Sequence, residues 1–271
     1  MQLKRKIDGI IEVEEVLDII EVGATIPVRC RLANGMNVVV KYMKNPFGQR
    51  VLINELIGSC ISDMIGLNIP EYGICNLSKD VIINTNLNED IDERNAGIAF
   101  YTKDYSSTVP PVRSMLTFVE EKQTEKIILF DHIVNNIDRH MGNLLLDLHQ
   151  NAILYIIDNS HIVTEKNEIM IEQELQESSI YSKRVLEKNK EVYDNLCFGM
   201  GYNEGKVILE AQKIRKILTN DVLRNIANEI PEIWAESVGR SNVDKLFEII
   251  SKRIEVIDDL GEMIVEERRK Q

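Results

Sequence analysis

The feature that most restricts the fold is a pair of short apolar segments whose polar neighbours would meet at one end. The segment "NNIDRHMGNLLLD" occupies residues 135–147, and "AILYIID" occupies residues 152–158. The short run between them, "LHQN", is the length expected of a β-hairpin loop. An antiparallel hairpin places the residue before its first strand beside the residue after its second strand. We therefore expect Asn143 and Asp158 to lie side by side, with Asp138 one short loop away.

Oxygen-bearing side chains at this end of the hairpin favour phosphoryl-transfer chemistry. Carboxylate and amide oxygens suit Mg²⁺, which retains some of its waters and binds nucleotide phosphates. Asn143 and Asp158 are therefore candidate metal ligands, and Asp138 could accept a proton from an attacking hydroxyl. Phosphoryl transfer needs a positioned metal ion and an oriented nucleophile, with little covalent chemistry by the protein. The pattern predicts an enzyme that uses ATP and Mg²⁺.

The first third of the chain predicts a β-rich unit with one helix. Asn34-Gly35 lies between two strand-like runs, and both residues tolerate positive φ, which makes it a strong hairpin signal. Apolar residues recur at helical spacing over residues 49–65, and Gly66 is a credible stop. Further strand candidates are "YGICNL", "DVIIN" and "AGIAFY", and the polar tract "NTNLNEDIDERN" between the last two predicts an exposed loop.

This unit also offers residues that could bind nucleotide phosphates. Lys41 closes the run "VVVK", where strand alternation directs it away from the face of Val40. Glu55 lies on the following helix and could pair with Lys41, and Gly23 falls where a loop between strands would cover the phosphates. The plainer alternatives are a surface strand end for Lys41 and a solvated helix face for Glu55.

Pro110-Pro111 marks the expected boundary between two lobes around a ligand cleft. Residues 1–109 would form a small β-rich N-lobe with one helix, and residues 110–271 a mainly helical C-lobe that contains the hairpin. The helical period after the prolines is interrupted near residues 122–124, and the chain from about residue 204 onward is again helical. The predicted fold class is α+β and bilobal.

Composition argues against several classes of protein. The formal net charge of −12 argues against nucleic acid and against anionic membrane as partners, because both require clustered Lys and Arg. The four cysteines are scattered without a CxxC pair, as in a reducing compartment. Acidic residues interrupt the apolar residues near the N-terminus, and no apolar run is long enough to cross a bilayer. We expect a cytoplasmic protein.

The hairpin motifs resemble those of the HipA-like kinases, a variant of the protein-kinase fold. The resemblance rests on "NNIDRHMGNLLLD" followed by "IIDNSH", and it covers roughly residues 20–165. The DRHxxN order also resembles the phosphoinositide kinases. The resemblance implies that Asp138 is the catalytic base, that Asn143 and Asp158 hold Mg²⁺, and that Lys41 contacts the α/β-phosphates of ATP. It further places Phe100 and Tyr101 near the segment that contacts adenine.

The sequence also departs from that family pattern. The phosphate loop has one glycine, Gly23, rather than three, and "DNSH" stands in place of DFG. The chain is shorter than the full HipA toxin, so a toxin–antitoxin role is not implied. HipA-like kinases can phosphorylate a serine in this loop, which makes Thr25 a candidate autophosphorylation site whose phosphate would block ATP. An ordinary turn threonine is the alternative.

The leading function is a serine/threonine protein kinase with ATP and a protein substrate as partners, and three alternatives remain open. A phosphoinositide-type lipid kinase is disfavoured because residues 159–178 are more acidic than basic. A small-molecule kinase could use the same core, and a nucleotide-binding pseudokinase could regulate a partner by conformation. A Mg-dependent hydrolase would not need Lys41 and Glu55. His140 and His161 are expected to brace their loops rather than to bind metal.

Overall fold

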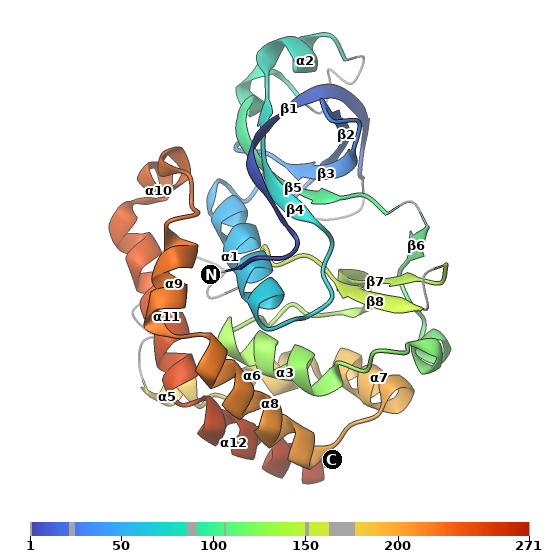
Figure 1. The fold of residues 1–271 in the computed structure, drawn as a ribbon, viewed down its shortest axis with the longest axis vertical. Helices are drawn as coiled ribbons and strands as arrows, with labels where there is room; N and C mark the ends of the chain where they lie inside the picture. The colour runs from blue at the N-terminus through green and yellow to red at the C-terminus, as the bar shows by residue number, and fades with distance from the viewer. Residues whose placement is uncertain are drawn as a thin grey trace.

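The computed structural model describes residues 2–21, 25–85, 91–105, 107–149, 152–162 and 177–270. Its N-terminal part is a closed barrel, in which the strands follow the order β1-β2-β3-β5-β4 (Figure 1). These strands are β1 (Lys6–Ile19), β2 (Val28–Leu32), β3 (Asn37–Lys41), β4 (Tyr72–Leu77) and β5 (Gly97–Lys103). The parallel pairing of β1 with β4 closes the ring, while the other pairs are antiparallel. The N-terminal β-rich unit is thus a barrel with its own small apolar interior.

The predicted hairpin at Asn34-Gly35 is confirmed. Gly35 has a φ of 82°, and its N–H donates to the carbonyl of Leu32 at 2.8 Å. The Asn34 side chain accepts from the N–H of Met36 at 3.0 Å. Positive φ is accessible to glycine without steric cost, so this turn can connect two strands that twist around each other. The turn sets the register of β2 and β3, in which Val28 pairs with Val40.

The predicted helix is α1 (Arg50–Met64), and every residue from Val51 to Asp63 is buried. It lies between the barrel and the C-terminal helices (Figure 1). Gly66, at a φ of 71°, follows its end as expected. By contrast, the strand predicted from "DVIIN" is wrong, because this segment is α2 (Lys79–Ile83). Ser78 caps this helix by accepting from the Val81 N–H at 3.3 Å, a local signal that outweighed the β-branched run.

The second sheet contains the predicted hairpin of β7 (Leu144–Asp147) and β8 (Ile153–Ile156). Leu144 pairs with Ile156, and the Ile157 N–H donates to the carbonyl of Asn143 at 3.0 Å. A third strand that the sequence did not predict, β6 (Thr108–Val109), pairs with β7. This strand comes just before Pro110-Pro111, so the chain joins the second sheet ahead of the predicted lobe boundary.

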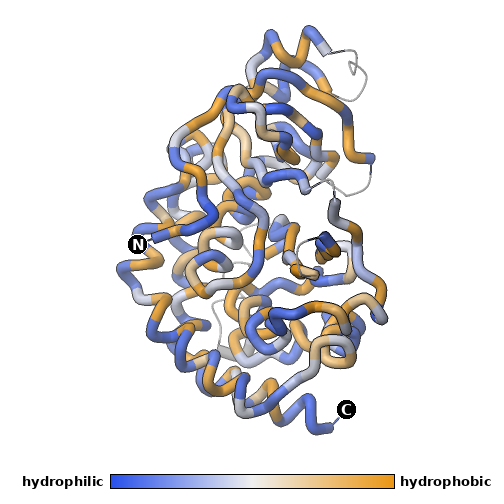
Figure 2. Tube along the Cα trace, turned by 45° about the vertical axis from the view of Figure 1, so that its right-hand side comes forward, coloured by the Kyte–Doolittle hydropathy of each residue, from blue (hydrophilic) through white to orange (hydrophobic). Residues whose placement is uncertain are grey.

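Helices make up the rest of the described chain. The predicted interruption near residues 122–124 is confirmed, because it separates the 3-10 helix Arg113–Phe118 from α3 (Thr124–Ile133). The segments that follow are α5 (Glu177–Ile180), α6 (Arg184–Lys188), α7 (Lys190–Met200), α8 (Glu204–Ile217), α9 (Asn220–Ala227), α10 (Glu232–Val238), α11 (Arg240–Glu255) and α12 (Ile257–Arg269). Short apolar and polar stretches succeed one another along the C-terminal helices, as expected when one face of each helix is buried (Figure 2).

One apolar core runs from α1 through the second sheet into the C-terminal helices. The helices α9 and α10 pack against α1 from the side opposite the second sheet (Figure 1). The buried indole of Trp234 in α10 donates to the carbonyl of Ile98 in β5 at 2.9 Å. The C-terminal part of the chain therefore returns to hold both α1 and the barrel. Within the described residues, no helix is long and apolar enough to span a membrane.

Candidate active site

Lys41 lies where the barrel meets α1, and the predicted ion pair with Glu55 is present. Val38 and Val40 of β3 face the barrel interior, so alternation directs Lys41 outward. Its Nζ lies 2.5 Å from Oε1 of Glu55, which is buried on α1. The same Nζ also lies 3.0 Å from Oδ1 of Asp158. Two carboxylates therefore hold one buried ammonium.

The charges of Lys41 and Asp158 are fixed by their mutual attraction. Burial alone would lower the pKa of Lys41, but Glu55 and Asp158 outweigh it and raise this pKa to about 12. Burial alone would raise the pKa of Asp158, but Lys41 and hydrogen bonds from Ser160 hold it well below its usual range. Lys41 is therefore a cation and Asp158 an anion at neutral pH.

The hairpin brings the loop that carries Asp138 to the same place. Asn143 ends the loop that begins at Asp138, and its Nδ2 donates to the Asp138 carbonyl at 2.8 Å. The Asp138 N–H donates to Oδ1 of Asn136 at 3.0 Å, and its side chain is half-buried. Since Ile157 is paired with Asn143, the following residue Asp158 emerges beside the loop. Asp158 has a φ of 58°, a left-handed conformation that turns its carboxylate from the strand direction toward Lys41.

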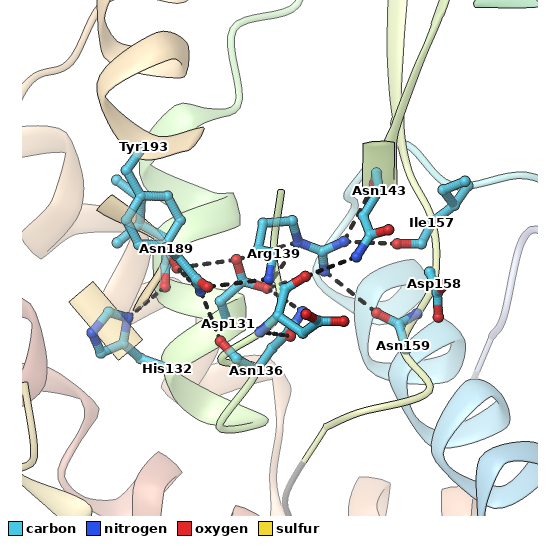
Figure 3. A network of polar contacts seen from close by, with 12 residues as sticks. Asp131, His132, Asn136, Arg139, Asn143, Ile157, Asp158, Asn159, Asn189 and Tyr193 are labelled. Atoms are coloured by element: carbon cyan, nitrogen blue, oxygen red, sulfur yellow. Dashed lines mark hydrogen bonds and ion pairs between the residues drawn. The ribbon is translucent and has the colours of Figure 1, made fainter. Parts of the chain in front are cut away.

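A buried arginine connects the loop to the strand that carries Asp158. Arg139 pairs with Asp131 of α3 at 3.0 Å, and both side chains are fully buried. Its Nη1 donates to the carbonyl of Ile157 at 2.7 Å, and Figure 3 shows the guanidinium between Asp131 and Ile157. Desolvation would lower the pKa of Arg139, but Asp131 raises it. Arg139 thus fixes α3, the loop and the end of β8 relative to one another.

Comparison with known proteins identifies the family of the chain. A family model described as HipA-like kinase matches residues 13–259. The chain belongs to the HipA-like kinases. It is therefore a kinase-type phosphotransferase, and membership of this family implies the use of ATP. No curated protein sequence matches the chain.

Several solved structures are similar to this chain at low sequence identity. The Helicobacter pylori proinflammatory kinase CtkA is similar with a TM-score of 0.57 and 13% identity, covering 93% of this HipA-like kinase and 97% of that chain. A Golgi casein kinase with Mn/ADP bound has a TM-score of 0.46 and 10% identity over 94% of this chain and 73% of that chain. HipA in a Shewanella oneidensis MR-1 complex with HipB and operator DNA has a TM-score of 0.44 and 12% identity, over 94% and 68%. The similarity to CtkA supports a protein-kinase-like fold.

The remaining predicted site residues of this HipA-like kinase lie in different surroundings. Gly23 falls outside the described residues, and Thr25 is buried, so a kinase could reach its hydroxyl only after the segment moved. Phe100 and Tyr101 lie within β5 and are fully buried, Phe100 in the main core and Tyr101 inside the barrel. The connection to the second sheet begins only at Asp104. Phe100 pairs with Lys41 across the sheet, so these two side chains lie on the same face, and a role of Phe100 and Tyr101 at adenine remains a prediction.

The two histidines singled out in the sequence have local contacts. The His140 ring accepts from the Gly142 N–H at 3.1 Å, which braces the loop as predicted. His161 packs edge-on against Phe47, with ring centroids 5.3 Å apart. Neither contact involves a metal-type cluster. Among the described residues, no group of three or more His, Cys, Asp or Glu side chains gathers to bind a metal.

The residues present nevertheless fit a Mg²⁺ ion bound together with nucleotide phosphates. Mg²⁺ is commonly held by one or two protein oxygens, with phosphates and waters completing its octahedron. Asp158 is ionised and partly exposed. The Asn143 amide nitrogen is bound to the loop, so its oxygen is the atom left for a metal. A pair of ligands, rather than a cage of carboxylates, is what such a site requires.

The sequence did not predict the residues of α7 and its N-terminal end that support the loop of Asp138 and Arg139. Asn189, just before α7, accepts from the Arg139 N–H at 3.1 Å and donates to the Asn136 carbonyl at 2.7 Å. Tyr193 donates to Asp131 at 3.0 Å (Figure 3). The signal for Arg139 was visible inside the DRH motif. Nothing in the sequence marked Asn189 or Tyr193, because they lie about 50 residues away and carry no recognisable pattern.

Proposed function

We propose that the chain is a Mg-ATP-dependent serine/threonine protein kinase. The observation that carries this proposal is the group in which Lys41 Nζ lies 2.5 Å from Glu55 and 3.0 Å from Asp158, beside the loop that holds Asp138 and Asn143. Kinases need a lysine that is held by a helix glutamate and directed at ATP phosphates. The buried pair supplies this lysine.

Each residue has one task in the proposed transfer. Lys41 presents a fixed positive charge to the α/β-phosphates, and Asp158 and Asn143 supply oxygen ligands for the metal. When bound, Mg²⁺ would neutralise charge that develops on the transferring phosphoryl group. Since the amide nitrogen of Asn143 binds the Asp138 carbonyl, the ligand and the catalytic loop keep one relative position. Preorganised charges of this kind are effective because they need no reorientation during the reaction.

Asp138 is proposed as the catalytic base. The substrate hydroxyl oxygen forms a bond to the γ-phosphorus as the bond to the ADP oxygen breaks, and the hydroxyl proton passes to the Asp138 carboxylate. Arg139, the next residue, is fully buried and tied to α3. This attachment gives Asp138 a rigid backbone on which to orient the hydroxyl.

A protein hydroxyl is the proposed acceptor, with lipid or small-molecule hydroxyls as the alternatives. We further propose two lobes, residues 1–109 and 110–271, with ATP between them. A cytoplasmic location is proposed because all four cysteines are free thiols. A pseudokinase is less favoured, since the lysine, the base and both metal ligands are all present.

The test is transfer of label from γ-labelled ATP with Mg²⁺, with phosphopeptide mass spectrometry to locate the labelled residue. Asp138→Ala and Asp158→Ala should each abolish labelling. Asp244→Ala, an exposed carboxylate on α11, is the matched control and should label like the wild type. Label on Thr25 would support the autophosphorylation hypothesis.

Other outcomes separate the alternatives. ATP binding that depends on Lys41, without any label, would favour an external substrate or a pseudokinase, and a panel of protein and lipid acceptors would then distinguish these. Survival of ATP cleavage in Lys41→Met would favour a hydrolase. Absence of ATP binding by the wild type would contradict the proposed function.

A further inference from the structure

The hydroxyl of Ser160 lies at the centre of the charged group around Lys41. Ser160 is buried, and its Oγ accepts from Lys41 Nζ at 2.8 Å while donating to Oε1 of Glu55 at 2.8 Å. Its backbone N–H donates to Oδ1 of Asp158 at 3.2 Å. One residue therefore contacts the lysine, the helix glutamate and the proposed metal ligand. No sequence motif singled it out, since it lies where a kinase DFG motif has glycine.

The segment that carries Ser160 is fitted closely to α1. Asn54 donates its side-chain Nδ2 to the carbonyls of Ser160 at 2.7 Å and Ile162 at 3.2 Å. The Asn159 N–H donates to Oε1 of Glu55 at 3.1 Å. Gly58 provides the space for Asn159, because a Cβ at Gly58 would lie 2.6 Å from the Asn159 side chain. The residues after Asp158 thus dock on one face of α1 through successive turns of the helix.

We propose that Ser160 is a positioning residue that couples the Lys41–Glu55 pair to Asp158. This inference rests on the proposed function, because it assigns Ser160 a task in binding Mg-ATP. Glu55 Oε1 accepts from Lys41, Ser160 and Asn159, so its orientation is fixed by three donors. When Lys41 turns toward phosphate, the Ser160 hydroxyl still holds Glu55, and α1 stays in register with the segment of Asp158.

The proposal predicts that the effect of Ser160 passes through Glu55. A hydroxyl bound to two charged groups in a buried site contributes more than an ordinary surface hydrogen bond. If that contribution depends on the Glu55 carboxylate, removing the Ser160 hydroxyl should weaken nucleotide binding less in a variant that lacks this carboxylate. Residues that act through one another give non-additive effects in a double-mutant cycle.

The experiment is such a cycle, built from Ser160→Ala and Glu55→Gln in the full chain. The measured quantity is the affinity for the non-hydrolysable ATP analogue AMP-PNP with Mg²⁺, by titration calorimetry. Ser160→Ala should weaken binding about tenfold in the wild-type background and less than about threefold in the Glu55→Gln background. An equal loss in both backgrounds would overturn the coupling. Melting temperatures of all four proteins should establish that each is folded.

A matched control is available on the same helix. Ser62 of α1 is fully buried, and its hydroxyl has no hydrogen-bond partner within the described part of the chain. Ser62→Ala removes the same atom from a similar environment and should leave the affinity for AMP-PNP unchanged. A loss equal to that of Ser160→Ala would mean that the effect is only one of helix packing, and would overturn the proposal.

The two proposals fail in different ways. Wild-type protein that does not bind AMP-PNP with Mg²⁺ would contradict the proposed function and this inference with it. Wild-type protein that binds and transfers phosphate, with an additive cycle at Ser160 and Glu55, would overturn only the positioning role.

Discussion

Two buried groups of charged residues lie at the candidate active site, and they differ in how much of their side chains is exposed to solvent. The Arg139–Asp131 pair has no exposed side-chain surface, and it is surrounded by hydrogen bonds from Asn136 and Tyr193. In the Lys41 group the lysine side chain is 11% exposed, Glu55 3% and Asp158 32%. Exposure therefore increases from the helix glutamate toward the proposed metal ligand.

This difference indicates two separate tasks. A closed ion pair has all its charge matched within the chain and can only hold parts of the fold together. A group that is open on the side of one carboxylate can still gain a ligand there. We therefore expect substitutions in the closed pair to reduce stability, and substitutions on the open side of the Lys41 group to reduce activity.

The largest expected effect comes from Asp158→Asn. The amide keeps the shape of the side chain but loses the charge for the metal, so we expect phosphoryl transfer to fall about 10³-fold. Because Glu55 still pairs with Lys41, the melting temperature should fall less than in a variant that leaves a fully buried charge unpaired. Labelling kinetics and thermal denaturation measure both quantities. Asp194→Asn, which removes a carboxylate paired with Lys190 and Arg268, is the control and should retain activity.

Substitution in the closed Arg139–Asp131 pair should mainly reduce stability. Arg139→Met leaves Asp131 as a buried charge without its partner, which typically costs about 3–5 kcal/mol of stability. The melting temperature should fall by roughly 10 °C for a chain of this size. Arg113→Met is the matched control, because Arg113 is exposed over the ring of Phe198 and should contribute less than about 1 kcal/mol. Similar losses in the two variants would contradict a structural role specific to Arg139.

Acid should destabilise the region of the closed pair through His132. His132, next to Asp131, is buried, and this burial lowers its pKa to about 4 from an ordinary value of 6.5. Its Nδ1 lies 2.8 Å from the Ile128 carbonyl, its Nε2 has no partner within the described residues, and Arg253 donates to its backbone carbonyl. A lowered pKa means that the folded state prefers neutral histidine. The contribution of His132 to the free energy of unfolding is therefore complete above pH 6.5 and is lost as the pH falls from 6.5 to 4.

The expected loss over this range is about 3 kcal/mol. Urea unfolding of wild type and of His132→Gln at several pH values measures this loss of stability. The difference between the two proteins separates the effect of His132 from that of the carboxylates, which also titrate in this range. Lys41 and Asp158 should keep their charges over the same range, since the pKa of Lys41 is raised and that of Asp158 is lowered, whereas burial raises the pKa of Glu55. A difference between the proteins that does not vary with pH would show that His132 is not held neutral.

The sequence predicted the open group better than the closed one. Lys41, Glu55 and Asp158 could be found because each has a short local signal: a strand end, a helix period and a hairpin end. The Arg139 network depends on Asn189 and Tyr193, whose contacts with the loop are created only by tertiary packing. Ser160 was missed for the same reason, since its side chain makes two contacts, with Lys41 and Glu55, across long sequence separations.

Local signals also misled where they competed. The β-branched run in α2 favours a strand, and only the cap at Ser78 gives the opposite signal. The closure of the barrel depends on β1 pairing in parallel with β4, more than 50 residues away. Nothing in the β1 sequence specifies that partner. Long-range pairing and the burial of polar groups are therefore the parts of this fold that the sequence could not supply.

The smallest expected effect tests whether the Lys41 group depends on the helices behind α1. Trp234→Phe removes the hydrogen bond to the Ile98 carbonyl and part of a buried ring, which should cost about 1–2 kcal/mol and lower the melting temperature by about 4 °C. Affinity for AMP-PNP should change less than about twofold, because Glu55 keeps its own contacts with Asn159 and Ser160. Tyr202→Phe is the control, since that hydroxyl is buried without a partner among the described residues. If Trp234→Phe weakened nucleotide binding tenfold, the position of α1 would depend on α10, and the Lys41 group would not be an independent unit.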